Sequence, residues 1–473
     1  MSAELREEAL VVFRSGLAAA DPYRLLRAKF REEPGKGFYL GSELGLPLPG
    51  PSGRILVLGA GKAVCSLANA LEQSLEPRDF SGRVLTKYGH GLPLQRLIVE
   101  EAGHPLPDAD GVAATKRLLD DLRDLGPEDR IFLLLTGGAS SLLVAPAQGL
   151  TLEDKIATTE LLLRSDATIQ EINAVRKHLS TIKGGRLLQA IAPAEVFTIV
   201  VSDVIGNDLS SIGSGPTVAD PTTFQDCLMI LERYGLSRRV PGEVKRHLEQ
   251  GTRGAFSETL KPGAPQLERA RHTILASNRH SLRAAQEKAE ALGFETEIFR
   301  WDMEGPVHDA ARAFAKSLTA LLERPRPQAL LAGGELTLEV RGSGKGGRNQ
   351  EFALVASREL QGLDGVAVLS AGTDGTDGPT DAAGALADGT TWSRALSIGL
   401  DPGALLANND AYTLFDRLGD LLRTGPSGTN VNDLVIGLTA WPDGLERPPE
   451  EVNRMRAAEV RLAAQNEVFK SVE

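Results

Sequence analysis

A lysine follows a short apolar run near the start of the chain, in the segment Gly59-Ala60-Gly61-Lys62. Glycines at the point where a strand leads into a helix let backbone amides approach an anion, and the lysine adds a positive charge. The segment is not a Walker A loop, because Leu56 and Ala63 stand where a glycine and a hydroxyl residue are required. We predict that Gly59, Gly61 and Lys62 hold a phosphate or a carboxylate. A surface lysine in a structural turn is the alternative.

The same segment is only part of a dinucleotide-binding fingerprint. Val64 replaces the third glycine, and the next predicted strand, residues 83–86, is followed by Lys87 instead of an acidic residue that would bind a ribose. The sequence therefore disfavours a nicotinamide cofactor.

A second glycine pair, Gly137 and Gly138, follows another apolar run and precedes Ser140 and Ser141. Glycines followed by hydroxyl groups can wrap a phosphate, although the serines serve equally well as helix caps. The flanking residues do not form the G-x-S-x-G pattern of a serine nucleophile. We expect Gly137, Gly138 and Ser140 to contact a phosphate.

Polar and basic residues recur at helical spacing after Thr168. Asn173, Arg176 and Lys183 share one face of the predicted helix and its extension, away from the apolar face. Such a cluster can bind a carboxylate or phosphate, and a solvated charged face is the alternative. His178, in the same segment, is expected to be a structural histidine.

Two fixed cations occur in the glycine-rich segment Gly344–Glu351. Lys345, Gly346, Gly347, Arg348 and Asn349 combine loop amides, a guanidinium fork and a helix start, which are the parts of a phosphate clamp. Glu335, which follows another glycine pair, is a candidate facing carboxylate.

Carboxylates follow two other predicted strands. Asp203 comes after the apolar run 196–201, and Asp374 and Asp377 lie in a run of Asp-Gly turns. Asp203 can hold Mg²⁺ or accept a hydroxyl proton, and the other two are secondary metal candidates. Ordinary turn or capping residues are the alternative at each position.

Taken together, these residues hold anions and carry carboxylates, with little provision for a covalent nucleophile or zinc. The cysteines, Cys65 and Cys227, make no paired motif, and we expect both thiols to be reduced. Phosphoryl transfer needs mainly positioning and charge neutralisation, so it fits this set of residues.

Strand and helix patterns alternate along most of the chain, which predicts an α/β fold with a parallel sheet. Capping boxes at Thr151 and Thr168 mark two helix starts. Strand signals fade between Leu236 and Arg271, so we place a Rossmann-like N-terminal domain at residues 1–240. A smaller C-terminal α/β domain is expected at 265–445, with its first strand at 272–276, followed by a helical tail at 446–473.

The net charge of −11 argues against a nucleic-acid or membrane binder, because either would require clustered basic residues. The N-terminus carries charges where a signal peptide has an apolar segment, so a cytoplasmic location is expected. The sequence leaves a homodimer open.

Several ordered motifs give the chain a resemblance to a known family. They are GAGKA at Gly59, TGGASSLL at Thr136, EINAVRKHLSTIKGGRL at Glu171, SDVIGNDLSSIGSGPTVADPTTF at Ser202, GGELTLEV at Gly333, GKGGRNQE at Gly344, AGTDGTDGPTDAAGA at Ala371 and GPSGTNVNDL at Gly425. On these motifs the chain resembles the glycerate 2-kinase family, whose C-terminal part is called the MOFRL region.

The resemblance implies two α/β domains around a deep cleft. It also implies transfer of the γ-phosphoryl group of ATP to the 2-hydroxyl of D-glycerate, with Mg²⁺, giving 2-phosphoglycerate. By position, Lys62 and Arg348 would be the catalytic cations, Asp203 would orient or deprotonate the hydroxyl or hold metal, and the loops at Gly137 and Gly346 would hold nucleotide phosphates. An NAD(P)-dependent hydroxypyruvate reductase is the alternative function.

Overall fold

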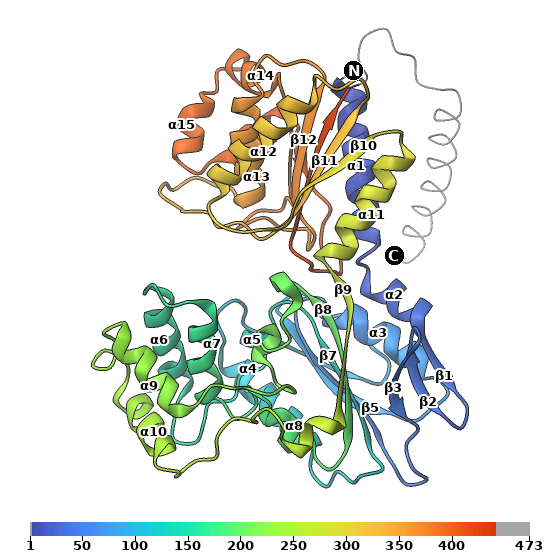
Figure 1. The fold of residues 1–473 in the computed structure, drawn as a ribbon, viewed down its shortest axis with the longest axis vertical. Helices are drawn as coiled ribbons and strands as arrows, with labels where there is room; N and C mark the ends of the chain where they lie inside the picture. The colour runs from blue at the N-terminus through green and yellow to red at the C-terminus, as the bar shows by residue number, and fades with distance from the viewer. Residues whose placement is uncertain (1, 441–473) are drawn as a thin grey trace. The chain divides into compact units, whose positions relative to one another are not determined.

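The computed structural model describes residues 2–440, and the chain divides into two units (Figure 1). The parallel-sheet unit comprises Asp21–Ser277 and Gly428–Asn430, and the mixed-sheet unit comprises, of the described residues, 2–20, Asn278–Ser427 and 431–440. The predicted tail at 446–473 lies outside the described residues.

The parallel-sheet unit is built on six strands that are all parallel to their neighbours. These are β4 (Ile55–Ala60), β5 (Ser81–Lys87), β6 (Ile98–Ala102), β7 (Arg130–Leu135), β8 (Glu195–Ser202) and β9 (Ala270–Ser277). Their spatial order is β6-β5-β4-β7-β8-β9. The chain therefore starts in the middle of the sheet, runs outward to β6 and returns to the other side at β7, which is the strand order of a Rossmann fold.

Both faces of this sheet are covered, which explains its long apolar strands. Leu56 and Leu58 of β4 pack in one core with α4 and α8. On the other face, Phe132 contacts Phe30 and Phe38 of the small antiparallel sheet β1-β2-β3, and Phe197 packs against Phe132. The elements are α2 (Pro22–Lys29), β1 (Phe30–Glu33), β2 (Gly37–Leu40), β3 (Glu43–Pro47), α3 (Val64–Leu75), α4 (Ala109–Asp121), α5 (Ala139–Leu142) and α8 (Arg186–Ile191).

A group of helices beside the sheet has a core of its own. It contains α6 (Leu152–Leu163), α7 (Ile169–His178), α9 (Phe224–Arg233) and α10 (Gly242–Thr252). The two predicted capping boxes begin α6 and α7, and Thr223 with Asp226 forms a third at α9. The 3₁₀ turns are η1 (Ile205–Asn207), η2 (Ile212–Ser214) and η3 (Pro265–Arg269).

The mixed-sheet unit has six strands in the order β10-β11-β15-β12-β13-β14. They are β10 (Glu295–Met303), β11 (Gln328–Gly334), β12 (Val366–Gly372), β13 (Gly384–Asp388), β14 (Leu421–Leu422) and β15 (Asp433–Thr439). Only β10 and β11 pair in parallel, and β15 is antiparallel to both of its neighbours. The last strand of the described chain, β15, thus occupies the middle of the sheet.

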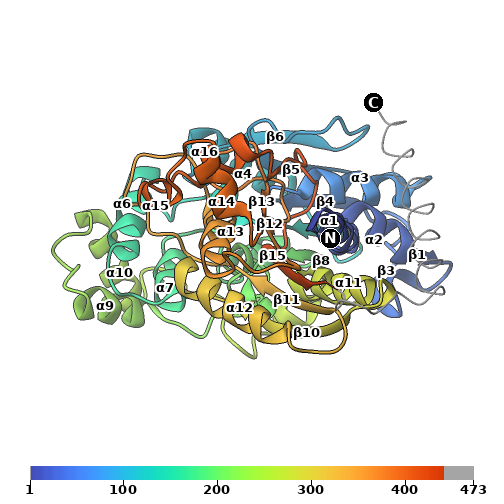
Figure 2. The same ribbon diagram turned by 90° about the horizontal axis from the view of Figure 1, so that it is seen from above.

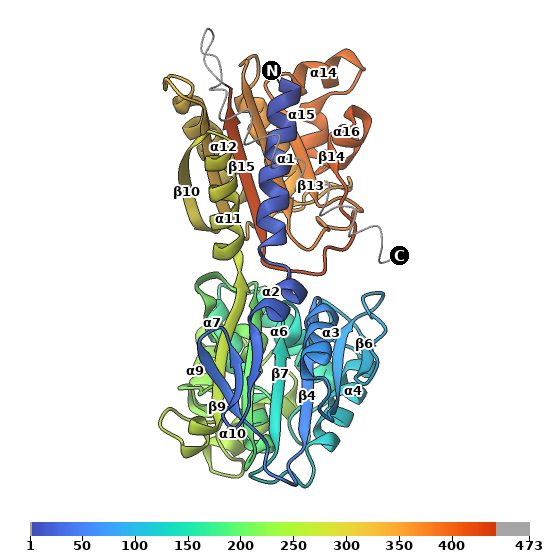
Figure 3. The same cartoon turned by 90° about the vertical axis from the view of Figure 1, so that its right-hand side faces the viewer.

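Helices cover both faces of the mixed sheet. α1 (Ser2–Ala18) and α11 (Asn278–Ala291) share a core with one face (Figure 3), and α12 (Val307–Leu321) and α13 (Arg348–Glu359) share a core with the other (Figure 2). The remaining helices are α14 (Thr391–Ser397), α15 (Pro402–Ala407) and α16 (Ala411–Leu418).

The α/β class and the Rossmann-like parallel sheet agree with the sequence prediction, but three segments fall elsewhere. Strand β9, expected to start the second domain, pairs with β8 and completes the first sheet. Helix α1 contacts the second sheet, and the short segment Gly428–Asn430 returns to the first unit. Thr337, after β11, makes an isolated bridge with Pro306. No helix between residues 2 and 440 combines the length and apolar character needed to cross a membrane.

Candidate functional site

The carboxyl ends of β4 and β7 meet at the point where the strand order of the parallel sheet reverses. Open α/β sheets bind ligands at this position. The amide of Lys62 donates to the carbonyl of Gly137 at 2.8 Å, and the amide of Ala63 donates to Thr136 Oγ1 at 3.1 Å. Two loops that are 75 residues apart in sequence (62 and 137) therefore form one surface.

Gly137 also allows Asp203, just after β8, to approach the same loops. A Cβ placed on Gly137 would lie 2.1 Å from Asp203 Oδ2, so no larger residue fits without displacing that carboxylate. Asn430 Nδ2 donates to the same oxygen at 3.1 Å. The structure thus brings Lys62, Gly137 and Asp203 together and adds Asn430, which the sequence analysis did not select although it lies in the GPSGTNVNDL motif.

The second half of the β7 loop leads to buried cations. Gly138 has a φ of +87° and precedes the short helix α5, which carries Ser140. The Oγ of Ser140 accepts from Arg176 at 2.6 Å and from Lys183 Nζ at 3.0 Å, and Lys183 also donates to the Ser140 carbonyl at 2.7 Å. The predicted residues Ser140, Arg176 and Lys183 are therefore in direct contact, and Asn173 lies 3.4 Å from Arg176.

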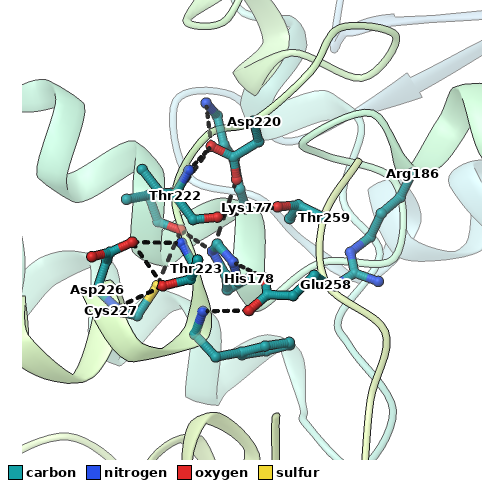
Figure 4. Close-up of polar contacts among 12 residues, drawn as sticks. Lys177, His178, Arg186, Asp220, Thr222, Thr223, Asp226, Cys227, Glu258 and Thr259 are labelled. Carbon is teal, nitrogen blue, oxygen red and sulfur yellow. Dashed lines mark hydrogen bonds and ion pairs between the residues drawn. The ribbon is translucent and has the colours of Figure 1, made fainter. Parts of the chain in front are cut away.

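Helix α7, which carries Arg176, is anchored at its C-terminal end by a buried polar network (Figure 4). His178 lies between two carboxylates: its Nε2 donates to Glu258 at 3.0 Å, and its Nδ1 is 4.0 Å from Asp220. Lys177 Nζ donates to Asp220 at 3.5 Å. His178 is fully buried. As expected it has a structural role, because its network holds in place the helix that carries Arg176.

In the mixed-sheet unit, Arg348 at the start of α13 is held by two carboxylates. Its Nε and Nη2 donate to the two oxygens of Asp433 at 2.6 and 3.1 Å, and its Nη1 donates to Glu335 at 2.9 Å. Burial opposes the charged guanidinium, but Asp433 and Glu335 outweigh it and raise the pKa of Arg348. Three of the five guanidinium N–H groups are used in these bonds, which leaves two to contact an anion.

Asp433 was not selected from the sequence, although it too belongs to the GPSGTNVNDL motif. It begins β15, and its Oδ1 also accepts from Asn349 Nδ2 at 3.0 Å. Asn349 is buried, and its own Oδ1 accepts from Ser370. Asn349, predicted to contact a ligand, therefore orients Asp433.

Asp377 caps the N-terminus of α13. Its two oxygens accept from the amides of Asn349 at 3.0 Å and Gln350 at 2.9 Å. Burial, with repulsion from Asp433, outweighs these bonds and raises the pKa of Asp377 to about 6. Both oxygens of Asp377 therefore accept from backbone amides, and capping the helix explains the position of this carboxylate without a bound metal.

The other predicted residues of this unit lie in turns. Asp374 Oδ1 accepts from the amide of Thr376 at 3.0 Å, and the Lys345 ammonium lies 3.9 Å from the ring centre of Tyr412. Gly347 is the N-cap of α13, directly after Gly346. Within residues 2–440, no group of three or more His, Cys, Asp or Glu side chains is placed to hold a metal. Cys65 and Cys227 are buried free thiols, as predicted.

Comparison with known proteins identifies relatives over nearly the whole chain. Residues 8–249 match a domain of unknown function, DUF4147, and residues 328–433 match the MOFRL family. A glycerate 2-kinase of Pyrococcus horikoshii is 40% identical over 93% of this chain and 99% of its own length. A putative hydroxypyruvate reductase of Agrobacterium vitis is 44% identical over 81% of this chain and 98% of its own length. The crystal structure of a glycerate kinase from Thermotoga maritima has a TM-score of 0.80 and 38% identity, covering 93% of this chain and all of that one (100%).

Proposed function

The chain belongs to the MOFRL-containing glycerate 2-kinase family, and on that basis we propose that it transfers the γ-phosphoryl group of ATP to the 2-hydroxyl of D-glycerate. The observation that carries this proposal most directly is the bonding of the Lys62 loop to the Gly137 loop where the strand order reverses. Two glycine-rich loops and an ammonium group at that edge supply amide donors and positive charge for phosphate oxygens.

In the proposed mechanism, the ammonium of Lys62 neutralises charge on the transferring phosphoryl group. Arg348 supplies its two remaining N–H donors to the phosphoryl group or to the carboxylate of glycerate, and Asp433 and Glu335 hold the guanidinium in one orientation. Asp203 is placed beside the Lys62 and Gly137 loops, and it accepts the proton of the 2-hydroxyl as the oxygen attacks phosphorus.

Mg²⁺ would be bound mainly by the nucleotide. In phosphoryl-transfer sites this ion keeps several waters and takes one or two protein carboxylates in addition to phosphate oxygens. Asp203 is the candidate for such a single ligand, because it follows β8 and lies against the Gly137 loop, where a Cβ on Gly137 would be 2.1 Å from its Oδ2. Asp377 fits less well, since both of its oxygens accept backbone amides. The bound ion would neutralise charge on the β- and γ-phosphates.

The similarity to the protein of Agrobacterium vitis named putative hydroxypyruvate reductase gives a second function to test. A Rossmann-type site for NAD has an acidic residue near the end of the second strand to bind the ribose, whereas a site for NADP has a basic residue there. The second strand here is β5, which ends at Thr86 and Lys87. The missing acidic residue therefore argues against an NAD-dependent reductase, and the assay below includes NADPH to test the other cofactor.

One experiment separates the two functions. The protein is incubated with D-glycerate, ATP and Mg²⁺ while ADP release and the phosphoglycerate isomer are measured, and hydroxypyruvate with NADH or NADPH is run in parallel. We expect ADP and 2-phosphoglycerate in a one-to-one ratio. Oxidation of the reduced nicotinamide without ADP release would refute the kinase, and 3-phosphoglycerate as the product would refute the assigned hydroxyl.

A further inference from the structure

A pocket of about 360 Å³ opens in the parallel-sheet unit beside the second half of the β7 loop. Ser140 and Ser141 line one side, α6 and α7 line another, and the segment Pro105–Pro107 lines a third. Its size falls in the range of small-ligand sites. Two features of its lining, its charge and its apolar rim, indicate the kind of molecule that it takes.

Three cations line one part of the pocket: Lys155, Arg176 and Lys183. Lys155 Nζ donates to the carbonyl of Leu179 at 2.9 Å, and Lys183 and Arg176 share Ser140 Oγ. All of their bonds within residues 2–440 go to neutral oxygens, and none of the three forms an ion pair there. Lys155 is 7% exposed and Lys183 only 2%.

Buried cations without a negative partner are costly to keep charged. Desolvation, with repulsion from Arg176, lowers the pKa of Lys155 to about 7 and lowers that of Lys183 well below its usual range. The only acidic residue that lines the pocket is Glu160, which is exposed and lies 3.9 Å from Arg164. An anionic ligand could therefore supply the negative partner that these three basic groups lack within the described residues, and would favour their charged forms.

Much of the remaining lining is apolar. Ile156 and Ile172 form part of the wall, and Leu106, Leu163 and Ile169 are 63%, 62% and 52% exposed. These three are among the ten large apolar side chains that are exposed in the described chain. Exposed apolar side chains that line the same pocket indicate that an apolar or aromatic part of a ligand covers them. Glycerate has no such group, whereas a nucleotide carries both a flat base and several negative charges.

We propose that this pocket is the nucleotide subsite, with the base against Leu106, Leu163 and Ile169 and phosphate oxygens at Lys155, Arg176 and Lys183. The proposal rests on the proposed kinase function and gives its nucleotide a location. Ser140 is two residues from Gly138, and a Cβ placed on Gly138 would lie 3.3 Å from Lys62 Cγ. A polyphosphate that starts at Ser140 therefore runs along the β7 loop toward Lys62.

The nucleotide should bind together with protons. Phosphate oxygens beside Lys155 and Lys183 favour the ammonium form, so each lysine that is neutral in the free protein takes up a proton on binding. Of the other titratable groups near Lys155, Glu160 is exposed, and burial lowers the pKa of His247 on α10. At pH 8.5, above the pKa of about 7 for Lys155, we expect a net uptake of roughly one proton at Lys155 for each ADP bound.

The test is calorimetric titration of the full chain with ADP at pH 8.5 in two buffers of different ionisation enthalpy. Lys155→Met keeps the length of the side chain and removes the charge, and Lys116→Met, on the exposed face of α4, is the matched control. We expect Lys155→Met to weaken ADP binding by about 10- to 100-fold, the effect of one hydrogen bond to a charged group, and to lower proton uptake. Lys116→Met should change neither.

The rim is tested separately. Leu163→Ser should weaken ADP binding and leave the binding of inorganic phosphate unchanged, because Leu163 contacts only the base. Unchanged ADP affinity in both Lys155→Met and Leu163→Ser would overturn the proposal. The proposal would also be overturned if 2-phosphoglycerate bound in a way that depends on Lys155 while ADP did not bind at all, because the pocket would then be a site for the phosphorylated acid. If the protein phosphorylates glycerate but both variants bind ADP as tightly as the wild type, the kinase function holds and the proposed nucleotide subsite is wrong. If ADP binds with the expected proton uptake and the expected loss of affinity in both variants, but glycerate is not phosphorylated, the subsite holds and the kinase function is wrong.

Discussion

Replacing Arg348 with alanine should affect stability and turnover by separate routes, and the two can be distinguished. Asp433 is 3% exposed and loses both hydrogen bonds from the guanidinium in this variant, keeping Asn349 as its partner. Removing one member of a buried ion pair costs about 3–5 kcal/mol. We take the lower end, about 3 kcal/mol, because the Arg348 side chain is 30% exposed. At about 2–4 °C per kcal/mol, the melting temperature should fall by about 6–12 °C.

The double variant Arg348→Ala with Asp433→Asn removes the charge that the single variant leaves behind. It should therefore regain about 2 kcal/mol of the free energy of unfolding. Turnover should not return, because an arginine that neutralises a transferring phosphoryl group contributes about 10³–10⁵ in rate. Arg312→Ala, an exposed arginine on α12, serves as the control and should alter stability by less than about 0.5 kcal/mol.

Urea unfolding and the release of ADP in the presence of glycerate measure the two effects on the same samples. A single variant as stable as the wild type would show that the pair with Asp433 contributes nothing to stability. Recovery of turnover in the double variant would refute the assignment of Arg348 to the reaction, since the loss would then come from an unpaired Asp433.

Three further predictions concern the parallel-sheet unit. Lys62→Ala should lower turnover by about 10³-fold or more in the ADP-release assay with a melting temperature close to that of the wild type; turnover near normal would exclude Lys62 from the reaction. Gly137→Ala places a Cβ 2.1 Å from Asp203 Oδ2 and 2.2 Å from Asn430 Nδ2, so it should separate that pair and reduce kcat more than it raises KM for ATP. Because the pKa of Lys155 falls from 10.5 to about 7 on folding, the unfolded chain binds more protons between these pH values. The free energy of unfolding measured in urea should therefore rise with pH in this window and fall as the pH drops through about 7, and Lys155→Met should reduce that slope by about 1.4 kcal/mol per pH unit. An unchanged slope in Lys155→Met would show that the pKa of Lys155 is not lowered on folding.

The sequence predicted those features that depend on local spacing. The capping boxes at Thr151 and Thr168 were identified because a hydroxyl and a carboxyl three residues apart satisfy each other's backbone donors, whatever lies around them. The strands that end near Lys62 and Gly137 were found for a similar reason, since long apolar runs followed by glycines are typical of buried parallel strands.

Features that depend on distant partners were not predicted. The apolar stripe of α1 shows that the helix packs on something, but it does not identify the second sheet as its partner. Lys155 has the sequence context of a surface lysine on a capped helix, and its burial comes from the neighbouring α7. Asp433 and Asn430 lie three residues apart, yet one contacts Arg348 and the other Asp203.

The central position of β15 has a consequence for how the chain is made. On the ribosome, the strands of the parallel sheet are all synthesised by Ser277, so that sheet can assemble early. The other sheet must wait, because β15 joins β11 to β12 and is completed only at Thr439. Until then α1, although synthesised before the strands of both sheets, has no finished surface to cover, and the unpaired edges of β11 and β12 are open to other chains. Biosynthesis should therefore be most sensitive to chaperones and to aggregation during the interval between Ser277 and Thr439.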